Sequence, residues 1–221
     1  MFRPSAADST TQMQTNTQVQ ERILTGAESL FTRFGIKNVT MDDIARHLGV
    51  SKKTIYQIFE DKNMLVSVLA RELTTCHLNK LEELAAISRN AIDEILHIMQ
   101  YMSGFFAKTN PSMFYDLQRY HPEGWKEFRK FKDRLLLDFV IRNMEKGREQ
   151  GLYRLDFSIR VLAKLRIEQV ELVMNPEIFP ADKYNLNEVQ LQLLDHFLHG
   201  ICTLKGHRLL NKYKQIQEDE A

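Results

Sequence analysis

Apolar residues recur every three or four positions along most of the chain, which is the spacing of one face of an α-helix. The first such stripe lies in residues 18–34 and consists of Ile23, Ala27, Phe31 and Phe34. No segment alternates apolar and polar residues in the manner of a half-buried strand. With nine glycines and five prolines, the chain also has few helix breakers. These features predict an all-α protein of about nine helices.

Two short helices around a tight turn are predicted for residues 40–62. Thr40 and Ser51 stand where the two helices need N-terminal caps, because their side-chain oxygens can accept hydrogen bonds from free backbone N–H groups. Gly49 ends the first helix, since glycine adopts the left-handed conformation without strain. The apolar positions that face each other are Ile44, Ala45 and Leu48 on the first helix and Ile55 and Phe59 on the second.

The other face of the second short helix is polar. It carries Lys52, Lys53, Thr54, Tyr56 and Gln57 within its first two turns. The major groove of DNA admits one α-helix, whose N-terminal residues meet base edges while cations and hydroxyls contact phosphates. An ordinary helical hairpin with solvated lysines would show the same pattern, so a two-helix pattern alone favours neither interpretation.

A longer, order-dependent set of residues resembles the DNA-binding segment of the TetR family of bacterial transcriptional regulators. The set is Phe34-Gly35, Thr40, Ile44-Ala45, Gly49-Val50-Ser51, Ile55-Tyr56, Phe59 and Lys62. The resemblance implies that Tyr56 and Lys62 contact phosphates and that Thr40 approaches the DNA backbone. It also implies that Lys52, Lys53, Thr54 and Gln57 face the groove. Ile58 departs from the family, because many members carry a histidine there and an isoleucine cannot bond a phosphate.

The predicted organisation is an N-terminal three-helix DNA-binding domain joined to a C-terminal helical domain for ligand binding and dimerisation. Residues 1–17 are polar and predict a disordered tail, residues 18–62 form the DNA-binding domain, residues 63–211 form the helical domain, and residues 212–221 form a second tail. Periodic segments of the helical domain predict one helix from Lys62 into the eighties and another over 90–108. A short helix that carries Phe114, Tyr115 and Tyr120 follows, and longer ones are predicted from Pro122 to Gly151, over 158–173 and over 187–210.

Aromatic side chains in the middle of the helical domain are candidates for an effector pocket. The candidates are His97, Tyr101, Phe105, Tyr115, Trp125 and Phe128. Pockets between helices are mostly apolar with a few polar groups. Plain core packing explains any single one of these residues better, because an apolar stripe at helical spacing is usually core. The family resemblance implies a cavity for a small apolar or amphipathic effector that the sequence does not identify.

The last two predicted helices carry apolar faces broader than one partner helix would cover. The candidate interface residues are Leu162, Leu165, Val173, Leu194, Phe197, Ile201 and Leu204. The resemblance implies that two such helices from each subunit form a four-helix interface. We therefore expect a homodimer.

Charge and motifs exclude several other functions. A formal net charge of +1 argues against a protein that coats nucleic acid indiscriminately. Cys76 and Cys202 lie far apart and suit reduced core thiols, while His196 and His199 are too few ligands for a metal site. No glycine-rich phosphate loop, serine elbow or Cys–His signature supports an enzyme, and no cofactor is expected. No apolar run of roughly 20 residues and no signal pattern occur, which predicts a cytoplasmic protein without a membrane partner.

The leading interpretation is a homodimeric repressor that binds a palindromic operator in double-stranded DNA and is released by a small-molecule effector. An activator, or a regulator controlled by another protein, would share the same sequence features. An all-α interaction protein that does not bind DNA is the alternative from a different class.

Overall fold

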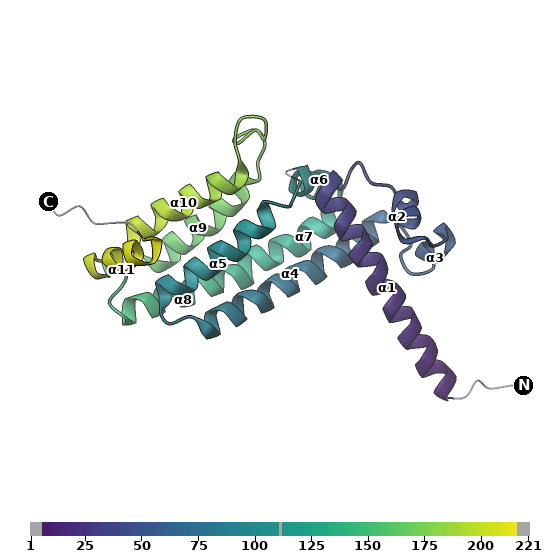
Figure 1. Cartoon of the computed structure of the whole chain (residues 1–221), viewed down its shortest axis with the longest axis horizontal. Coiled ribbons are helices and arrows are strands. Elements are labelled where there is room, and N and C mark those ends of the chain that lie inside the picture. Colours follow the sequence, from purple (N-terminus) through teal and green to yellow (C-terminus); the bar gives the residue numbers. More distant parts are fainter. Residues whose placement is uncertain (1–5, 111, 216–221) are drawn as a thin grey trace, which may run out of the picture.

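A computed structural model describes residues 6–110 and 112–215, with side chains described from residue 17 onward. Within these ranges the regular elements are helices, apart from one antiparallel bridge between Tyr153 and Cys202. The prediction of an all-α fold is therefore confirmed. Figure 1 shows a small N-terminal head at one end of an elongated bundle of helices.

The head consists of α1 (Ala6–Phe34), α2 (Met41–Leu48) and α3 (Lys52–Tyr56). The helix α1 begins at Ala6 and not at Gln18, so the expectation of a disordered tail over residues 1–17 is wrong for the part that the structure describes. The physical reason is that no glycine or proline lies between Ala6 and the apolar stripe, so a helix anchored by that stripe can extend through good and neutral helix formers.

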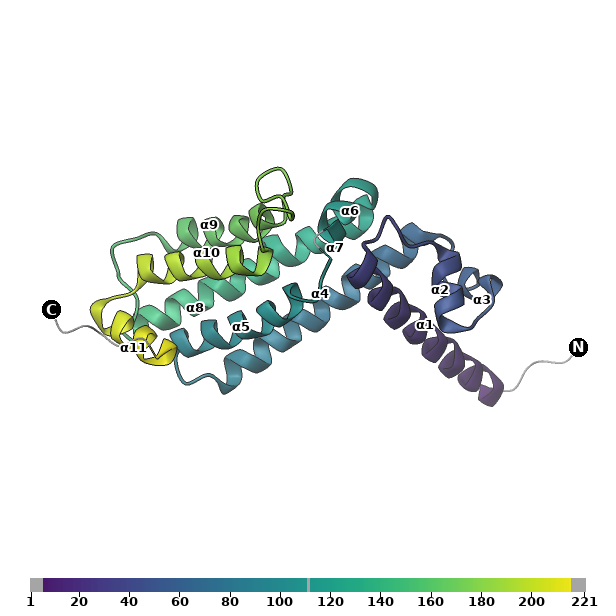
Figure 2. The same ribbon diagram turned by 45° about the horizontal axis from the view of Figure 1, so that its top comes forward.

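Four helices follow in the bundle: α4 (Lys62–Ile87), α5 (Ala91–Phe106), α6 (Ser112–Tyr120) and α7 (Pro122–Lys130). The helix α4 runs from the head along α7 and α5 to the far end of the bundle, as both views show (Figures 1 and 2). The helix α4 thus connects the two parts of the chain.

The long helix predicted from Pro122 to Gly151 contains a wider turn. After α7 the chain forms the π-helix η1 (Phe131–Leu136) and then α8 (Leu137–Glu149). A π-turn, closed by i→i+5 bonds, holds one residue more than an α-turn, so it shifts the helical phase. Leu135 is consequently exposed, while Leu136 lines the bundle interior.

The C-terminal part contains α9 (Ile159–Val173), α10 (Leu186–Ile201) and α11 (Leu204–Lys214). The single helix expected over 187–210 is therefore wrong. It is interrupted at Thr203, whose N–H donates to Leu152 O at 2.9 Å and whose hydroxyl caps α11. This cap and the Tyr153–Cys202 bridge offer the backbone more favourable partners than a continued α10 would.

Two clusters of buried apolar residues hold the molecule together. The first joins residues of α1–α3 to residues of α4, α6, α7 and α9, so the core of the head continues into the bundle without a gap near residue 62. The second lies between α5, α8, α9, α10 and α11 at the opposite end. Cys202 belongs to the second cluster as expected, but Cys76 is exposed on α4 and is not a core thiol.

Candidate functional site

The head is built by local signals that the sequence contains. Thr40 caps α2 in a capping box: its hydroxyl accepts from Asp43 N at 3.2 Å, and Asp43 Oδ2 accepts from Thr40 N at 2.9 Å. The Thr40 hydroxyl also donates to Asp43 Oδ2 at 2.6 Å, and this bond, together with the one from Thr40 N, lowers the pKa of Asp43. Gly49 has φ of 65°, the left-handed conformation that ends α2. Ser51 then caps α3 by accepting from Thr54 N at 3.1 Å.

The short helix α3 turns one face inward and the other to solvent. Ile55 is fully buried against the core of the head. The exposed residues are Lys52, Lys53, Tyr56 and Gln57, and Thr54 is half-buried beside them. The structure therefore gathers the residues predicted to face the groove on one surface. Their contacts with DNA stay a prediction.

Two of the predicted DNA-contacting cations have partners within the head. Lys52 Nζ lies 2.6 Å from Asp42 Oδ1, which neutralises part of its charge. Lys62 Nζ donates to Ile36 O at 2.6 Å, and burial lowers its pKa. Lys53 has no carboxylate within ion-pair distance among the described residues, so it is the cation most available to DNA.

Ile58, the departure from the pattern of the family that the sequence resembles, is half-buried and packs against the core of the head. An apolar contact thus occupies this position. The missing phosphate contact inferred from the sequence is consistent with this placement.

The joint between the head and the bundle is formed by α6 and the start of α7. Asp116 on α6 is buried and accepts from Lys37 N at 2.8 Å. Gly35 packs so closely that a Cβ atom there would lie 2.4 Å from Ser112 Oγ. His121 Nδ1 lies 2.7 Å from Asn63 Oδ1, and burial lowers the pKa of His121. Movement of α6 must therefore move the head.

The bundle encloses an apolar cavity of about 180 Å³ between α4–α8, η1, α9 and α10. Of the predicted pocket residues, Phe105 and Phe128 line it. The four α6 and α7 residues that line it, Met113, Phe114, Leu117 and Phe128, also belong to the core cluster that includes the head. The cavity wall and the joint thus share the same helix.

Four predicted pocket residues lie elsewhere, which corrects the expectation. His97 Nδ1 is 2.9 Å from Ser88 Oγ, and Tyr115 is exposed. Trp125 stacks on the ring of Phe128 and lines a separate surface depression. Tyr101 does not line the cavity, but its hydroxyl lies 2.7 Å from Nδ1 of His77, which does. Helical spacing identified apolar faces, but it could not identify which face of α5 or α7 meets the cavity.

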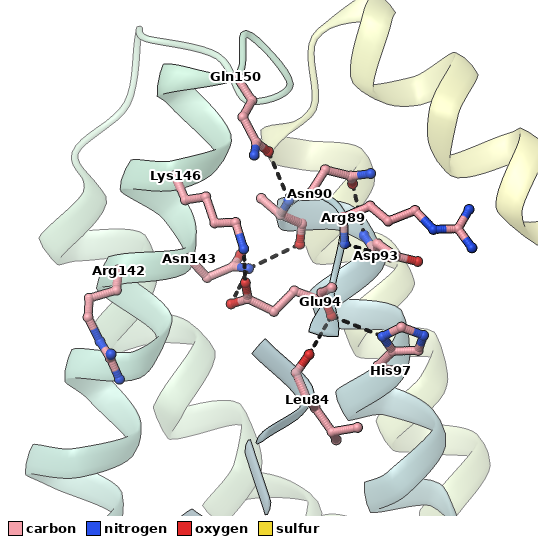
Figure 3. A network of polar contacts seen from close by, with 12 residues as sticks. Leu84, Arg89, Asn90, Asp93, Glu94, His97, Arg142, Asn143, Lys146 and Gln150 are labelled. Carbon is pink, nitrogen blue, oxygen red and sulfur yellow. Dashed lines mark hydrogen bonds and ion pairs between the residues drawn. The ribbon is translucent and has the colours of Figure 1, made fainter. Parts of the chain in front are cut away.

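One end of the cavity is polar, and its groups bond each other. Asn143 Nδ2 donates to Glu94 Oε1 at 2.9 Å and to Ala91 O at 3.0 Å, while Lys146 Nζ lies 2.6 Å from Glu94 Oε2. Figure 3 shows Asn143 and Lys146 of α8 pointing toward Glu94 on α5. Tyr153 Oη donates to Asn143 Oδ1 at 3.2 Å. These bonds hold the side chains at the polar end of the cavity in place.

Comparisons with known proteins identify the head. Residues 23–69 match the profile of a family described as bacterial regulatory proteins, tetR family. A curated relative, the uncharacterized HTH-type transcriptional regulator YvaF of Bacillus subtilis (strain 168), is 22% identical over 186 residues, which cover 83% of this chain and 95% of that protein. Residues 23–69 thus form a DNA-binding segment of the TetR family.

Solved structures show the same fold over most of the chain. A transcriptional regulator of the TetR family from Agrobacterium tumefaciens has a TM-score of 0.70 at 19% identity, covering 85% of this chain and all of that one. Thermus thermophilus FadR, a TetR-family repressor in complex with lauroyl-CoA, has a TM-score of 0.54 at 22% identity, covering 91% of this chain and 98% of that one. The protein is thus a transcriptional regulator with an N-terminal helix-turn-helix domain and a C-terminal helical domain.

The TetR-family protein buries more of the predicted interface than expected. Val173, Leu194, Phe197 and Ile201 are buried in the core of the single chain, and Leu162 is half-buried against it. Leu165 and Leu204 are exposed. Simple helical periodicity does not separate a face that packs on the same chain from one that packs on a partner. The sequence reasoning missed Val161 and Leu172, which continue the exposed apolar stripe of Leu165 along α9.

The histidines at the end of α10 contact groups of the same chain. His199 Nδ1 lies 3.1 Å from His207 Nδ1, and His199 Nε2 lies 3.6 Å from Asp195 Oδ1. His196 is exposed. Within the ranges that the structure describes, no group of three or more His, Cys, Asp or Glu side chains is arranged to hold a metal ion, and no helix is long and apolar enough to cross a membrane.

Proposed function

We propose that this TetR-family regulator is a homodimeric repressor that acts in the cytoplasm, binds a palindromic operator in double-stranded DNA and is released by a small effector in the bundle cavity. Each head would place α3 in a major groove. Lys53 and Gln57 would then meet base edges, and Tyr56 would contact a phosphate. The exposure of these three residues on one face of α3 supports this orientation.

The observation that carries the proposal is the double role of α6. Its residues Met113 and Leu117 line the cavity, while its residues Ser112 and Asp116 hold the loop of the head at Gly35 and Lys37. A ligand that displaces the cavity face of α6 must displace the groups on its other face, because packed helices move as units. The two heads of a dimer would then no longer match two half-sites.

The coupling obeys a thermodynamic constraint. An effector weakens operator binding only by as much as it prefers the DNA-incompetent conformation, and operator DNA weakens effector binding by the same factor. In a repressor of this kind, the effector therefore lowers the affinity for the operator, and the operator lowers the affinity for the effector. An activator would show the opposite sign, and a protein-controlled regulator would show no response to a ligand in the cavity.

The first test is binding of the purified full-length protein to DNA upstream of its own gene. We expect a footprint with two-fold symmetry, since the two heads of a dimer contact two half-sites. Lys53→Ala should weaken the complex, whereas Lys183→Ala removes the same charge from an exposed site in the loop before α10 and serves as the control. Equal effects of the two variants, or no footprint on upstream DNA, would favour an all-α interaction protein that does not bind DNA.

A second test separates base reading from phosphate contact on α3. Gln57→Ala is expected to weaken operator binding by about 1–3 kcal/mol and to leave unrelated DNA nearly unchanged, because a base contact exists only in the specific complex. Tyr56→Phe should weaken both DNAs alike, because a phosphate contact carries no sequence information. Competition gel shifts with operator variants measure both effects. If the Gln57→Ala protein and the unmodified protein rank the operator variants in the same order of affinity, α3 is oriented differently in the groove.

A further inference from the structure

The cavity is lined by two cations and by no aspartate or glutamate. Lys132, on the π-helix η1, is fully buried but compensated, since its Nζ bonds Glu171 and lies 3.3 Å from Glu168 Oε2 and 3.5 Å from Asp133 Oδ1. Its charge is therefore already neutralised from outside the cavity. The second cation, Arg166 of α9, is placed differently.

Arg166 has no countercharge among the residues that the structure describes. Its Nη1 donates to the neutral Gln169 Oε1 at 3.2 Å, and no carboxylate of the described residues lies within ion-pair distance. Burial lowers the pKa of Arg166 to about 10, which still leaves the guanidinium charged at neutral pH. Arg166 is half-buried. A guanidinium has five N–H donors, and removing part of its surface from water is unfavourable unless the charge is paired. The position therefore favours an anion.

A second unsatisfied donor lines the same cavity from the neighbouring helix. Gln190 of α10 is only 9% exposed, and its Nε2 has no hydrogen-bond partner in the described part of the chain. Buried amide nitrogens are rarely left unpaired in native proteins. The helices α9 and α10 pack against each other, with Arg166 in the middle of α9 and Gln190 one turn into α10.

The other polar groups of the lining already have partners. The Thr74 hydroxyl donates to Ala70 O at 2.9 Å, the His77 ring bonds Tyr101, and Asn143 and Tyr153 belong to the Glu94 network. Among the described lining residues, donors of Arg166 and Gln190 are left without an acceptor. The rest of the wall is aliphatic or aromatic.

We propose that Arg166 and Gln190 bind the carboxylate of an amphiphilic effector, whose aliphatic chain fills the apolar cavity. The inference rests on the proposed function, because it assigns the chemical class of the ligand to the same cavity. Carboxylates accept from guanidinium and amide donors, and charge-assisted hydrogen bonds are stronger in an environment shielded from water. A cavity of about 180 Å³ is somewhat larger than the roughly 150 Å³ that accommodates benzene in an engineered protein, so a short to medium chain fits best.

Calorimetric titration of the full-length protein with octanoate and 1-octanol tests the headgroup separately from the chain. Octanoate should bind about 10- to 100-fold more tightly than 1-octanol, because hydrogen bonds between charged groups exceed those of neutral ones. Arg166→Met should remove that preference while 1-octanol keeps its affinity. Arg166→Lys should retain part of the preference. Arg160→Met, an exposed position on the same helix outside the cavity lining, is the control and should change neither affinity.

Four outcomes would overturn the inference. They are equal binding of octanoate and 1-octanol to the unmodified protein, an equal loss of both ligands in Arg166→Met, tighter binding of octanoyl-coenzyme A than of octanoate, and dissociation of a dimer by Arg166→Met. The third would assign the site to a thioester, and the fourth would mean that a carboxylate of the partner subunit pairs with Arg166.

Octanoate binding without release of operator DNA would contradict the proposed repressor mechanism but not this site. Operator binding without octanoate binding would contradict this site but not the proposed binding of operator DNA.

Discussion

Gly147→Ala is expected to lower the free energy of unfolding by about 3 kcal/mol, at the upper end of the usual range for overpacking a core. A Cβ atom on Gly147 would lie 2.0 Å from Tyr153 Cδ2, far inside van der Waals contact. The Tyr153 ring cannot move away easily, because it is 1% exposed, its hydroxyl bonds Asn143 and its backbone pairs with Cys202. Urea unfolding followed by circular dichroism measures the change.

Gly104→Ala is the matched control for this prediction. Gly104 also lies within a helix, α5, but a Cβ atom there meets nothing within 4 Å. Alanine should then stabilise the protein by about 0.5–1 kcal/mol, because glycine loses more conformational entropy in a helix. Similar changes in the two variants would mean that helix propensity, and not contact with Tyr153, decides the outcome at residue 147.

The contrast between these glycines shows which features the sequence could predict. The caps of α2 and α3 and the left-handed Gly49 depend on residues within one turn, and they were predicted from local patterns alone. The close approach of Gly147 to Tyr153 depends on the turn between α8 and α9. Nothing in the helical pattern around Gly147 marks it as different from Gly104.

The cavity was predicted only in part, for the same reason. Both Phe105 and Trp125 lie on apolar stripes, but only Phe105 meets the cavity, because the positions of neighbouring helices decide which side of a stripe faces it. The π-turn η1 further changes the phase after Phe131. The sequence does not mark Arg166 and Gln190 as ligand-binding residues, since polar residues on helices predicted to form an interface are ordinarily solvated. Their missing partners become evident only when the surrounding side chains are placed.

Replacing Val161 and Leu165 together by glutamate is expected to convert the proposed dimer into a monomer. These side chains are 64% and 50% exposed on α9, one turn apart, so they form part of an apolar stripe that the single chain does not cover. Four carboxylates would then face each other across a two-fold interface, which is unfavourable when they are removed from water. Glutamate favours helices, so the fold of each chain should persist. Sedimentation velocity measures the mass, and circular dichroism checks the helix content.

The loss of the dimer should weaken operator binding by about 10²- to 10⁴-fold, because linking two heads makes the second contact intramolecular. Binding of a single head to unrelated DNA should change much less. Ile87→Glu is the matched control, since Ile87 is 69% exposed and is the last residue of α4. The C-terminal end of α4 lies away from α9 and α10 in both views (Figures 1 and 2), so this replacement adds a carboxylate to apolar surface outside the proposed interface. A double variant that still sediments as a dimer would place the interface elsewhere. A monomeric variant with full operator affinity would instead contradict recognition by paired heads, because one α3 would then supply the whole of the binding energy.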